Sequence, residues 1–445
     1  MSDVLLGEKL RIGLSSAALN GIKNVYWSLF TLFGMVYLTD VIGLSPALAG
    51  TILFASLLFD ALIDLPIGGY LDGLRGRLED YGVILISSAG LSSLSLIAFY
   101  GVSLLSSGSI EIALLVGTLF AFRLMFSIFD VTENAINVRV MTNPTDRTLV
   151  SSLRKVAQSL ATILLGASMG WVFQAQSDYG VRIAILASFA SAILVFLTFA
   201  FYQNLRDLDR GGAPLVEATF KERLAAIRRA PGCWIMAGLA ILEACGTTIL
   251  MSGLIYYALV VLQEPAWVGA AVIAMTLSQI VGQPLWIWLA RLFGKVTAFG
   301  LTHGTASAAG LIFAVFGGDS GAVALGLICL VGILLGGVST LRWSLMPDII
   351  DKAAETNRVR VESGMIGLVI CAIQTGAALA AVTLGLGLSE IGYQAGGSTE
   401  NPNQLVVVVV APFIVLNGLS AAAIAILHRR LHRASHQEND GLASH

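Results

Sequence analysis

The sequence predicts an all-α membrane protein with about twelve transmembrane helices in two bundles of six. Of its 445 residues, 56% are hydrophobic and only 12% are charged, whereas a soluble globular domain carries about 25% charged residues. Apolar stretches long enough to cross a bilayer core recur along the chain, for example 83–105, 183–201 and 405–427. Backbone groups in lipid must be hydrogen-bonded within their own segment, so spans of this length are expected to be helical.

The expected spans follow one another with short gaps, except for a longer polar segment in the middle of the chain. This pattern predicts an N-terminal bundle over 1–204, a central loop over 205–231, a C-terminal bundle over 232–428 and a tail over 429–445. The individual helices are expected near 12–39, 47–71, 82–105, 110–138, 150–175, 180–204, 232–262, 267–290, 295–317, 321–346, 361–390 and 404–428.

The basic residues indicate how the chain is oriented. Cytoplasmic loops of membrane proteins carry an excess of Lys and Arg, and here one alternate set of loops holds nearly all of them, whereas the other set has little beyond Arg182. Both termini and the central loop are therefore expected in the cytoplasm, with the chain in the cell (inner) membrane. The basic set comprises Arg75, Arg77, Arg139, Arg147, Arg206, Arg210, Lys221, Arg223, Arg228, Arg229, Arg291, Lys295, Lys352, Arg358, Arg360, Arg429, Arg430 and Arg433.

The two halves of the chain echo each other. Pro-Ala-Leu-Ala-Gly at 46–50 is matched by Pro-Ala-Trp-Val-Gly at 265–269, in each half just after the first span. A proline follows about twenty residues later in both, Pro66 and Pro284. Six spans repeated in one orientation predict two bundles related by an axis along the membrane normal, with a substrate site near the midplane.

Several charged residues fall inside expected spans, where a charge is costly and suggests a function. Asp60 and Asp64 are four apart, so they share one helix face. Two like charges there require either that one carboxyl is protonated or that a cation lies between them. Both outcomes suit an ion-coupling site, although a solvated helix end near Pro66 is the alternative for Asp64. The charged residues inside expected spans are, in full, Lys23, Asp60, Asp64, Arg123, Asp130, Glu133 and Glu243.

The remaining charges leave alternatives open. Asp130 shares a face with Arg123, seven residues before it, and an internal ion pair of Arg123 with an acid could be purely structural. Lys23 is either an interior counter-charge or a snorkelling lysine, and Glu133 lies nearer the cytoplasmic end, where a capping role is the alternative. Glu243 stands alone in the second half, so the acids outnumber Lys23 and Arg123 and some carboxylates are expected to be protonated.

Four stretches occur in a characteristic order and spacing: Tyr37–Leu44 (YLTDVIGL), Asp60–Pro66 (DALIDLP), Asp130 followed by Asn143–Arg154 (NPTDRTLVSSLR), and Asp348–Asp351 (DIID) with Arg360 and Glu362. In this order they resemble the glycoside–pentoside–hexuronide:cation symporter family of the major facilitator superfamily.

The resemblance implies the major facilitator fold and roles for individual residues. Asp60, Asp64 and Ser127 would form the cation-coupling site, and Lys23, Asn24, Asp130, Asn134 and Arg154 would bind a sugar, with Gln374 at a position where many relatives have a lysine. Structural or gating roles would fall to Arg123, Arg75, Arg77, Asp348, Asp351 and Arg360.

The chain departs from the family at informative positions. Ile63 replaces a polar residue before the second aspartate, and since sodium needs several oxygen ligands, this favours a proton over sodium. Asn134 stands where one relative has a tryptophan, and Asn24 replaces an acid that binds sugar. These changes weaken the assignment of the substrate more than that of the fold.

We therefore expect cation-coupled symport of a small polar solute, a sugar or glycoside, by alternating access. Transport of an amphiphile such as a lysophospholipid, and a sensor that transports nothing, are the alternatives. An intramembrane enzyme is disfavoured, because Gly166–Gly170 fits G-x-S-x-G without its strand–turn–helix context. No cofactor beyond the coupling ion, H+ or Na+, no metal site and no nucleic-acid partner are expected. The partners would be the solute and the bilayer, and the chain is expected to be a monomer.

Overall fold

The computed structural model describes residues 2–73, 78–104, 109–140, 144–173, 178–206, 225, 227–357, 362–396, 398–399 and 401–443. Within these residues the chain is helical apart from short connections and one isolated bridge between Gln394 and Ser398. Eleven of the described helices are long and apolar enough to cross a membrane. The predicted all-α membrane protein is confirmed.

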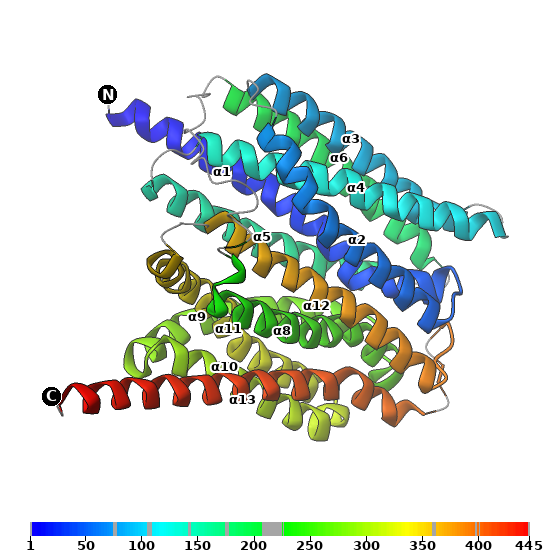
Figure 1. Cartoon of the computed structure of the whole chain (residues 1–445). Helices are drawn as coiled ribbons and strands as arrows, with labels where there is room; N and C mark the ends of the chain where they lie inside the picture. The colour runs from blue at the N-terminus through cyan, green and yellow to red at the C-terminus, as the bar shows by residue number, and fades with distance from the viewer. Residues whose placement is uncertain are drawn as a thin grey trace. The chain divides into compact units, whose positions relative to one another are not determined.

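The helices run in chain order as labelled in Figure 1. In the first half they are α1 (Ser2–Ser28), η1 (Leu29–Gly34), η2 (Tyr37–Val41), α2 (Pro46–Gly73), α3 (Leu78–Gly101), η3 (Val102–Leu104), α4 (Ser109–Val140), α5 (Pro144–Phe173) and α6 (Tyr179–Leu205). The second half has α8 (Pro231–Tyr257), η5 (Ala258–Leu262), α9 (Trp267–Phe293), α10 (Lys295–Phe316), η6 (Gly317–Asp319), α11 (Gly321–Asn357), α12 (Glu362–Glu390) and α13 (Pro402–Ala443).

These bounds follow the expected spans closely, with two extensions and one interruption. Helix α11 continues to Asn357, so Asp348 and Asp351, expected in a loop, lie inside a helix; the good helix formers Lys, Ala and Glu after Pro347 favour this. Helix α13 likewise continues to Ala443. The first expected span is divided between α1 and two π-helical segments, and it is absent from the eleven continuous apolar helices.

The first span of each half ends in a π-helical segment, η2 and η5. A residue with positive φ follows in both, Gly43 (79°) and Gln263 (55°). π-helical turns are rare and are found mostly as local insertions at functional places. The repeat seen in the sequence therefore extends to the backbone.

The glycine of each repeated Pro-Ala-x-x-Gly segment lies against the backbone of another helix. A Cβ atom on Gly50 would lie 2.6 Å from the carbonyl oxygen of Ala381, and one on Gly269 would lie 2.5 Å from that of Gly166. No side chain fits at such a distance, and small residues are what close packing between membrane helices requires. The repeated motif thus marks equivalent close helix contacts.

The chain forms two compact units. The first contains Met1–Glu217, Pro265–Val272 and Ala381–Glu400, and the second contains Ala218–Glu264, Ile273–Ala380 and Asn401–His445. In the first unit α1 packs on α5 and α6, and α4 packs on α2 and α3; in the second, α13 packs on α8 and α10, and α10 also packs on α11. The bundle boundaries expected at 204 and 232 stay a prediction.

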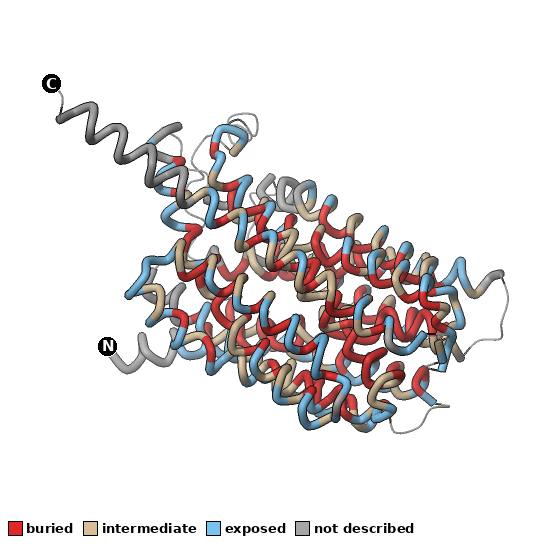
Figure 2. The backbone as a smooth tube through the Cα atoms, turned by 90° about the horizontal axis from the view of Figure 1, so that it is seen from below, coloured by how far each residue is buried: buried red, intermediate tan, exposed pale blue. Residues whose placement is uncertain are grey.

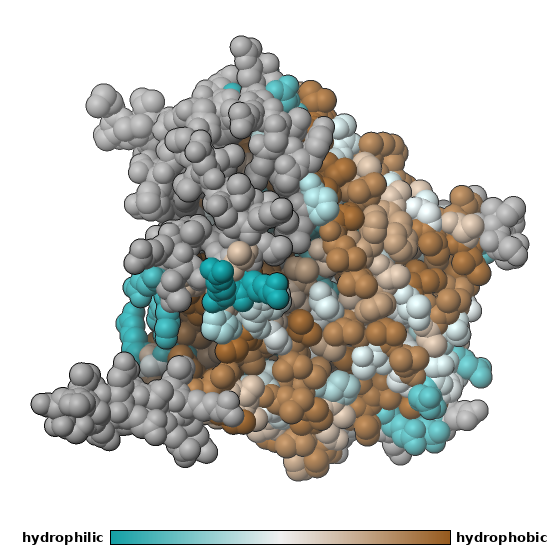
Figure 3. Space-filling view, in the orientation of Figure 1, coloured by the Kyte–Doolittle hydropathy of each residue, from teal (hydrophilic) through white to brown (hydrophobic). Residues whose placement is uncertain are grey.

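Large apolar side chains remain on the outside of both units. Leu164, Phe189, Phe196 and Val281 are each at least two-thirds exposed. Figure 2 shows exposed and buried residues alternating along the helices, and in Figure 3 hydrophobic side chains cover most of the described surface on the face shown. An apolar exterior of this kind is what lipid chains contact in a multi-pass membrane protein.

The motif at 37–44 forms hydrogen bonds that connect the end of the first span to two other segments. The hydroxyl of Tyr37 donates to the carbonyl oxygens of Phe99 and Tyr100, at 3.0 and 3.1 Å. The carboxylate of Asp40 accepts hydrogen bonds of 2.8 Å from the Tyr393 hydroxyl and from the Gly396 backbone N–H. One motif therefore holds both α3 and the segment that follows α12.

Candidate polar transport site

A network of charged side chains lies inside the first unit, with Lys23 of α1 at its centre. The ammonium of Lys23 pairs with Asp130 and lies 2.6 Å from Oε2 of Glu133, both on α4. The guanidinium of Arg154, on α5, donates to the same Glu133 oxygen at 3.1 Å. Lys23 is 7% exposed and Glu133 is fully buried. Lys23 is thus an interior counter-charge, and Glu133 is not a solvated cap at the helix end.

Amide and hydroxyl groups complete this network. Arg154 also donates to the side-chain oxygens of Asn134 (2.9 Å) and Asn20 (3.0 Å). Asn137 donates to the second oxygen of Glu133, and Ser16 donates to Asn137. A buried charge is tolerated only when its remaining hydrogen-bonding capacity is satisfied, and these neutral groups satisfy Glu133.

Helical spacing explains why three helices can supply one network. The participants on each helix recur at spacings of three or four residues, with Asn24 and Asn134 directly beside Lys23 and Glu133, so they line neighbouring positions on one side of each helix. They are Ser16, Asn20, Lys23 and Asn24 on α1, Asp130, Glu133, Asn134 and Asn137 on α4, and Arg154, Gln158 and Thr162 on α5. Asn24 contacts α5, where it donates to the Thr162 hydroxyl at 2.7 Å and to the Gln158 carbonyl oxygen at 3.2 Å.

The network has a buried end and an accessible end. The side chains of Asp130 and Arg154 are 38% and 20% exposed, whereas those of Lys23 and Glu133 are 8% and 0% exposed. Asp130 can only accept hydrogen bonds and Arg154 can only donate them. Both groups bond Asn134, so an accessible carboxylate and a guanidinium lie on either side of one amide and can together bind hydroxyl groups of a polar solute.

A second group of charges in the first unit involves α2 and α4. Asp60 lies 3.6 Å from Nη1 of Arg123, and both side chains are buried. The Arg123 guanidinium also lies over the Phe30 ring at 4.8 Å from its centroid, and its Nε has no hydrogen-bond partner among the described residues. Asp64 instead accepts a hydrogen bond from Ser127. The two aspartates on one helix face therefore have different partners.

The second unit contains an ion pair that the sequence analysis missed. Glu243 of α8, expected to stand alone, pairs with Arg342 of α11, whose side chain is 7% exposed. Arg342 lies inside the expected span 321–346, so the rule that selected the other buried charges could have found it. No local sequence pattern links the two partners, because they are 99 residues apart in the chain. Elsewhere in this unit, buried His303 shares a 2.9 Å hydrogen bond with Asn417.

The other expected residues lie apart from these groups. Asp348 is exposed and bonds Lys295 at 2.7 Å, and Asp351 is exposed on the same helix. Gln374 is half-buried on α12, in the part that belongs to the second unit. Arg75, Arg77 and Arg360 lie outside the described residues.

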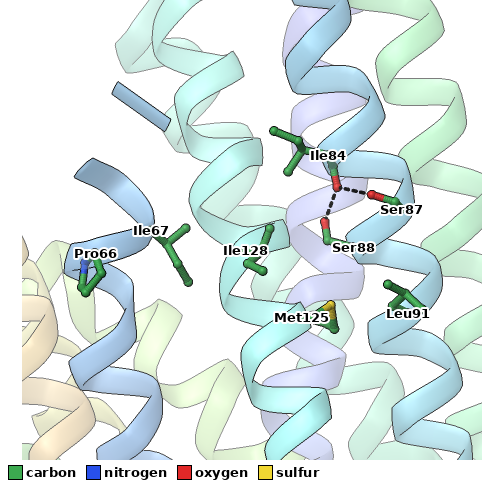
Figure 4. A pocket seen from close by; sticks show the side chains of 8 residues that line it. All are labelled: Pro66, Ile67, Ile84, Ser87, Ser88, Leu91, Met125 and Ile128. Carbon is green, nitrogen blue, oxygen red and sulfur yellow. Dashed lines mark hydrogen bonds between the residues drawn. The ribbon is translucent and has the colours of Figure 1, made fainter. Parts of the chain in front are cut away.

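An apolar groove of about 400 Å³ in the first unit does not have the character of a polar site (Figure 4). It lies between α2, α3 and α4, and among the described residues that line it Ser87 and Ser88 carry the hydroxyls. Both donate to the carbonyl oxygen of Ile84 on their own helix, at 3.2 and 2.6 Å. None of its described lining residues is charged. Within the described part of the chain, no three His, Cys, Asp or Glu residues form a group that could hold a metal ion.

Comparison with known proteins identifies the kind of molecule. The family model described as MFS/sugar transport protein matches residues 13–432. The chain is 22% identical to the inner membrane symporter YicJ of Escherichia coli (strain K12), over 96% of this chain and 92% of that protein. It is 20% identical to a putative sulfoquinovose importer of the same organism, over 96% and 91%.

Solved structures show the same fold. The crystal structure of the nucleoside transporter NupG matches with a TM-score of 0.66 and 13% identity, over 94% of this chain and 98% of that one. The resemblance inferred from the four sequence stretches is confirmed, and the protein is a transporter of a small molecule, not an enzyme. The chain belongs to the MFS/sugar transport protein family of the major facilitator superfamily.

Proposed function

We propose that the protein is a symporter that couples a cation, a proton in preference to sodium, to the movement of a sugar-like polar solute. The observation that carries the proposal is the Lys23 network. Its side chains Asp130 and Arg154 are accessible, whereas Lys23 and Glu133 form its buried, hydrogen-bonded end. Relatives described as a symporter and as a sulfoquinovose importer support both the mode of transport and the class of solute.

The contacts of Asp60 suggest how the cation acts. Arg123 occupies the position of a counter-ion at 3.6 Å, a distance too long for a good hydrogen bond. A cation that binds Asp60 would replace Arg123 as its partner, and the released guanidinium would favour a different arrangement of α2 and α4. A ligand shifts a conformational equilibrium only by its differential affinity for the two states, and the exchange at Asp60 supplies such a difference.

A proton suits this exchange better than sodium. Sodium requires several oxygen ligands, and the helix face of Asp60 and Asp64 offers Ile63 at a position where the family resemblance implies a polar residue. Ser127 supplies one hydroxyl, which already donates to Asp64. A proton needs only one carboxylate oxygen, so the loss of a ligand does not affect it.

The test is uptake of labelled glycosides and sulfonated sugars into proteoliposomes under separately imposed proton and sodium gradients. The wild type should accumulate solute under the proton gradient, and Asp60→Asn should lose accumulation while retaining solute binding. Asp178→Asn, at an exposed position before α6, is the matched control and should behave as the wild type. The proposal fails if neither gradient drives uptake, or if Asp60→Asn accumulates solute normally.

In the proposed topology the protein lies in the inner membrane of the cell, with both termini in the cytoplasm. It rests on the uneven distribution of Lys and Arg between alternate loops. Single cysteines introduced near Arg75 and near Arg182 should react with an impermeant maleimide from opposite sides in a variant that lacks the native cysteines. Labelling of both from one side would reject this topology.

A further inference from the structure

The second unit contains a cavity that the transport proposal does not use. Its volume is about 630 Å³, and it lies between the N-terminal end of α8 and the neighbouring faces of α10, α11 and α13. Its walls are largely aliphatic and aromatic, with Ile235, Leu239, Phe299, Ile349 and Leu427 among them. The size falls within the range of about 300–1,000 Å³ that is typical of small-ligand sites.

One end of this cavity is positively charged. Arg229 and Lys352 both line it, and both are exposed. On α11, Leu345, Ile349 and Lys352 follow one another at four and three residues, so the cation continues the face that supplies the apolar wall. Asp348 and Glu355 share that face by spacing, but Asp348 bonds Lys295, and Asp348, Asp351 and Glu355 are not among the lining residues.

The start of α8 adds to the positive potential. Pro231 and Gly232 line the cavity, and the residue before the helix, Ala230, supplies no side-chain cap. Pro231 has no N–H and the Cys233 N–H donates to the carbonyl oxygen of Ala230 at 3.0 Å, so this end attracts an anion through the helix dipole and the N–H of Gly232. Two cations and an uncapped helix end thus meet at the mouth of one apolar cavity.

We propose that this cavity binds an anionic phospholipid, with the phosphate at Arg229, Lys352 and the start of α8 and an acyl chain along the apolar wall. The charge of the mouth and the hydrophobicity of the wall match the two parts of such a lipid. Arg229 and Lys352 belong to the segments expected on the cytoplasmic side, where anionic lipids attract basic residues. The site does not involve the Lys23 network, so an experiment can reject lipid binding here without rejecting the proposed symport.

The groove of Figure 4 provides an internal contrast. It is similarly apolar, but none of its described lining residues is a cation. An acyl chain can occupy either place, whereas the cavity of the second unit has described cations that can also select the lipid by its headgroup.

The test uses the full chain purified in detergent and titrated with phosphatidylglycerol or phosphatidylcholine, with bound lipid counted by native mass spectrometry. The wild type should bind one phosphatidylglycerol well before any phosphatidylcholine. Arg229→Gln with Lys352→Gln should weaken phosphatidylglycerol binding about thirtyfold, since each cation near an anionic lipid contributes about fivefold. Arg11→Gln with Arg291→Gln removes two exposed charges outside the cavity and should leave binding unchanged.

A second variant tests the apolar wall without changing any charge. Val296 lines the cavity and is half-buried, so Val296→Trp should fill part of the space and weaken phosphatidylglycerol binding at least tenfold. Equal binding of the two lipids by the wild type overturns the proposal. The proposal is also overturned if the double variant at Arg229 and Lys352 binds phosphatidylglycerol as the wild type does. An unchanged melting temperature without lipid would show that this variant is folded.

Discussion

The buried charges of the two units differ in the number of partners they bond and in how accessible those partners are. The first unit joins two acids, two bases and several amides from three helices, and leaves Asp130 and Arg154 accessible at one end. The second unit joins one acid and one base, Glu243 and Arg342, both largely buried. Glu243 and Arg342 expose little of their side chains to a solute, whereas Asp130 and Arg154 in the first unit are accessible. This contrast, more than the presence of charge, distinguishes a candidate binding site from an internal brace.

Breaking the pair of Glu243 and Arg342 should give the largest effect. Arg342→Met leaves Glu243 buried without its partner and should cost about 3–5 kcal/mol of stability, measured by thermal unfolding in detergent. The double variant Glu243→Gln with Arg342→Met removes both charges and should recover most of that loss.

The same double variant sharpens the comparison. Because the pair is an internal brace in this interpretation, uptake by the double variant should stay within about threefold of the wild type. A stable double variant without uptake would instead place Glu243 and Arg342 in the transport mechanism.

Changes in the open network should affect transport more than stability. Lys23→Met leaves Asp130 and Glu133 without their shared cation and should lower uptake about a hundredfold, the equivalent of roughly 2.7 kcal/mol. Asp130→Asn removes one accessible charge and should lower solute affinity with a smaller loss of stability. The prediction is wrong if solute affinity, measured by calorimetry, is unchanged in Asp130→Asn.

The sequence predicted the spans well because hydrophobic length is a local property that needs no knowledge of partners. It selected Lys23 and Asp130 as charges inside expected spans and Arg154 through the family resemblance, and the structure brings the three together. It missed Asn20 and Asn137, because neutral polar residues are common in membrane helices and carry no signal until a charged neighbour is known. Glu243 appeared isolated because its partner is distant in the sequence, and pairing is a property of the folded chain.

The repeated glycines allow a smaller test within the first unit. Gly50→Leu and Gly269→Leu insert a side chain where a Cβ alone would lie within 2.6 Å of a carbonyl oxygen. Overpacking of this kind costs about 1–3 kcal/mol, so each variant should slow uptake about tenfold. Gly117→Leu is the matched control, since a Cβ there meets no atom within 4 Å. Normal uptake by both glycine variants would show that these close contacts are not needed for the transport cycle.

The smallest effect is expected at Asp40. An asparagine there keeps an oxygen that can accept from Tyr393 and Gly396, but it loses the second oxygen, which accepts from Thr39 at 2.6 Å, and the added strength of a charged acceptor. Asp40→Asn should therefore lower stability by about 1 kcal/mol, measured as a shift of the unfolding midpoint. Tyr393→Phe removes one of the same two bonds and should give a similar shift. A loss several times larger would mean that the charge itself has a further partner.

The π-helical segments after α1 set the angle between the two ends of the first span. Successive residues of an α-helix are about 100° apart around its axis, and a π turn holds one residue more than an α turn. Deleting one residue from Leu29–Gly34 would let that turn become α-helical, and everything beyond it would rotate by roughly a quarter turn or more. Lys23 would keep its neighbours while Asp40 turned away from Tyr393. The wider turn therefore acts as an angular spacer, which lets one span meet two sets of partners that a uniform helix could not face together.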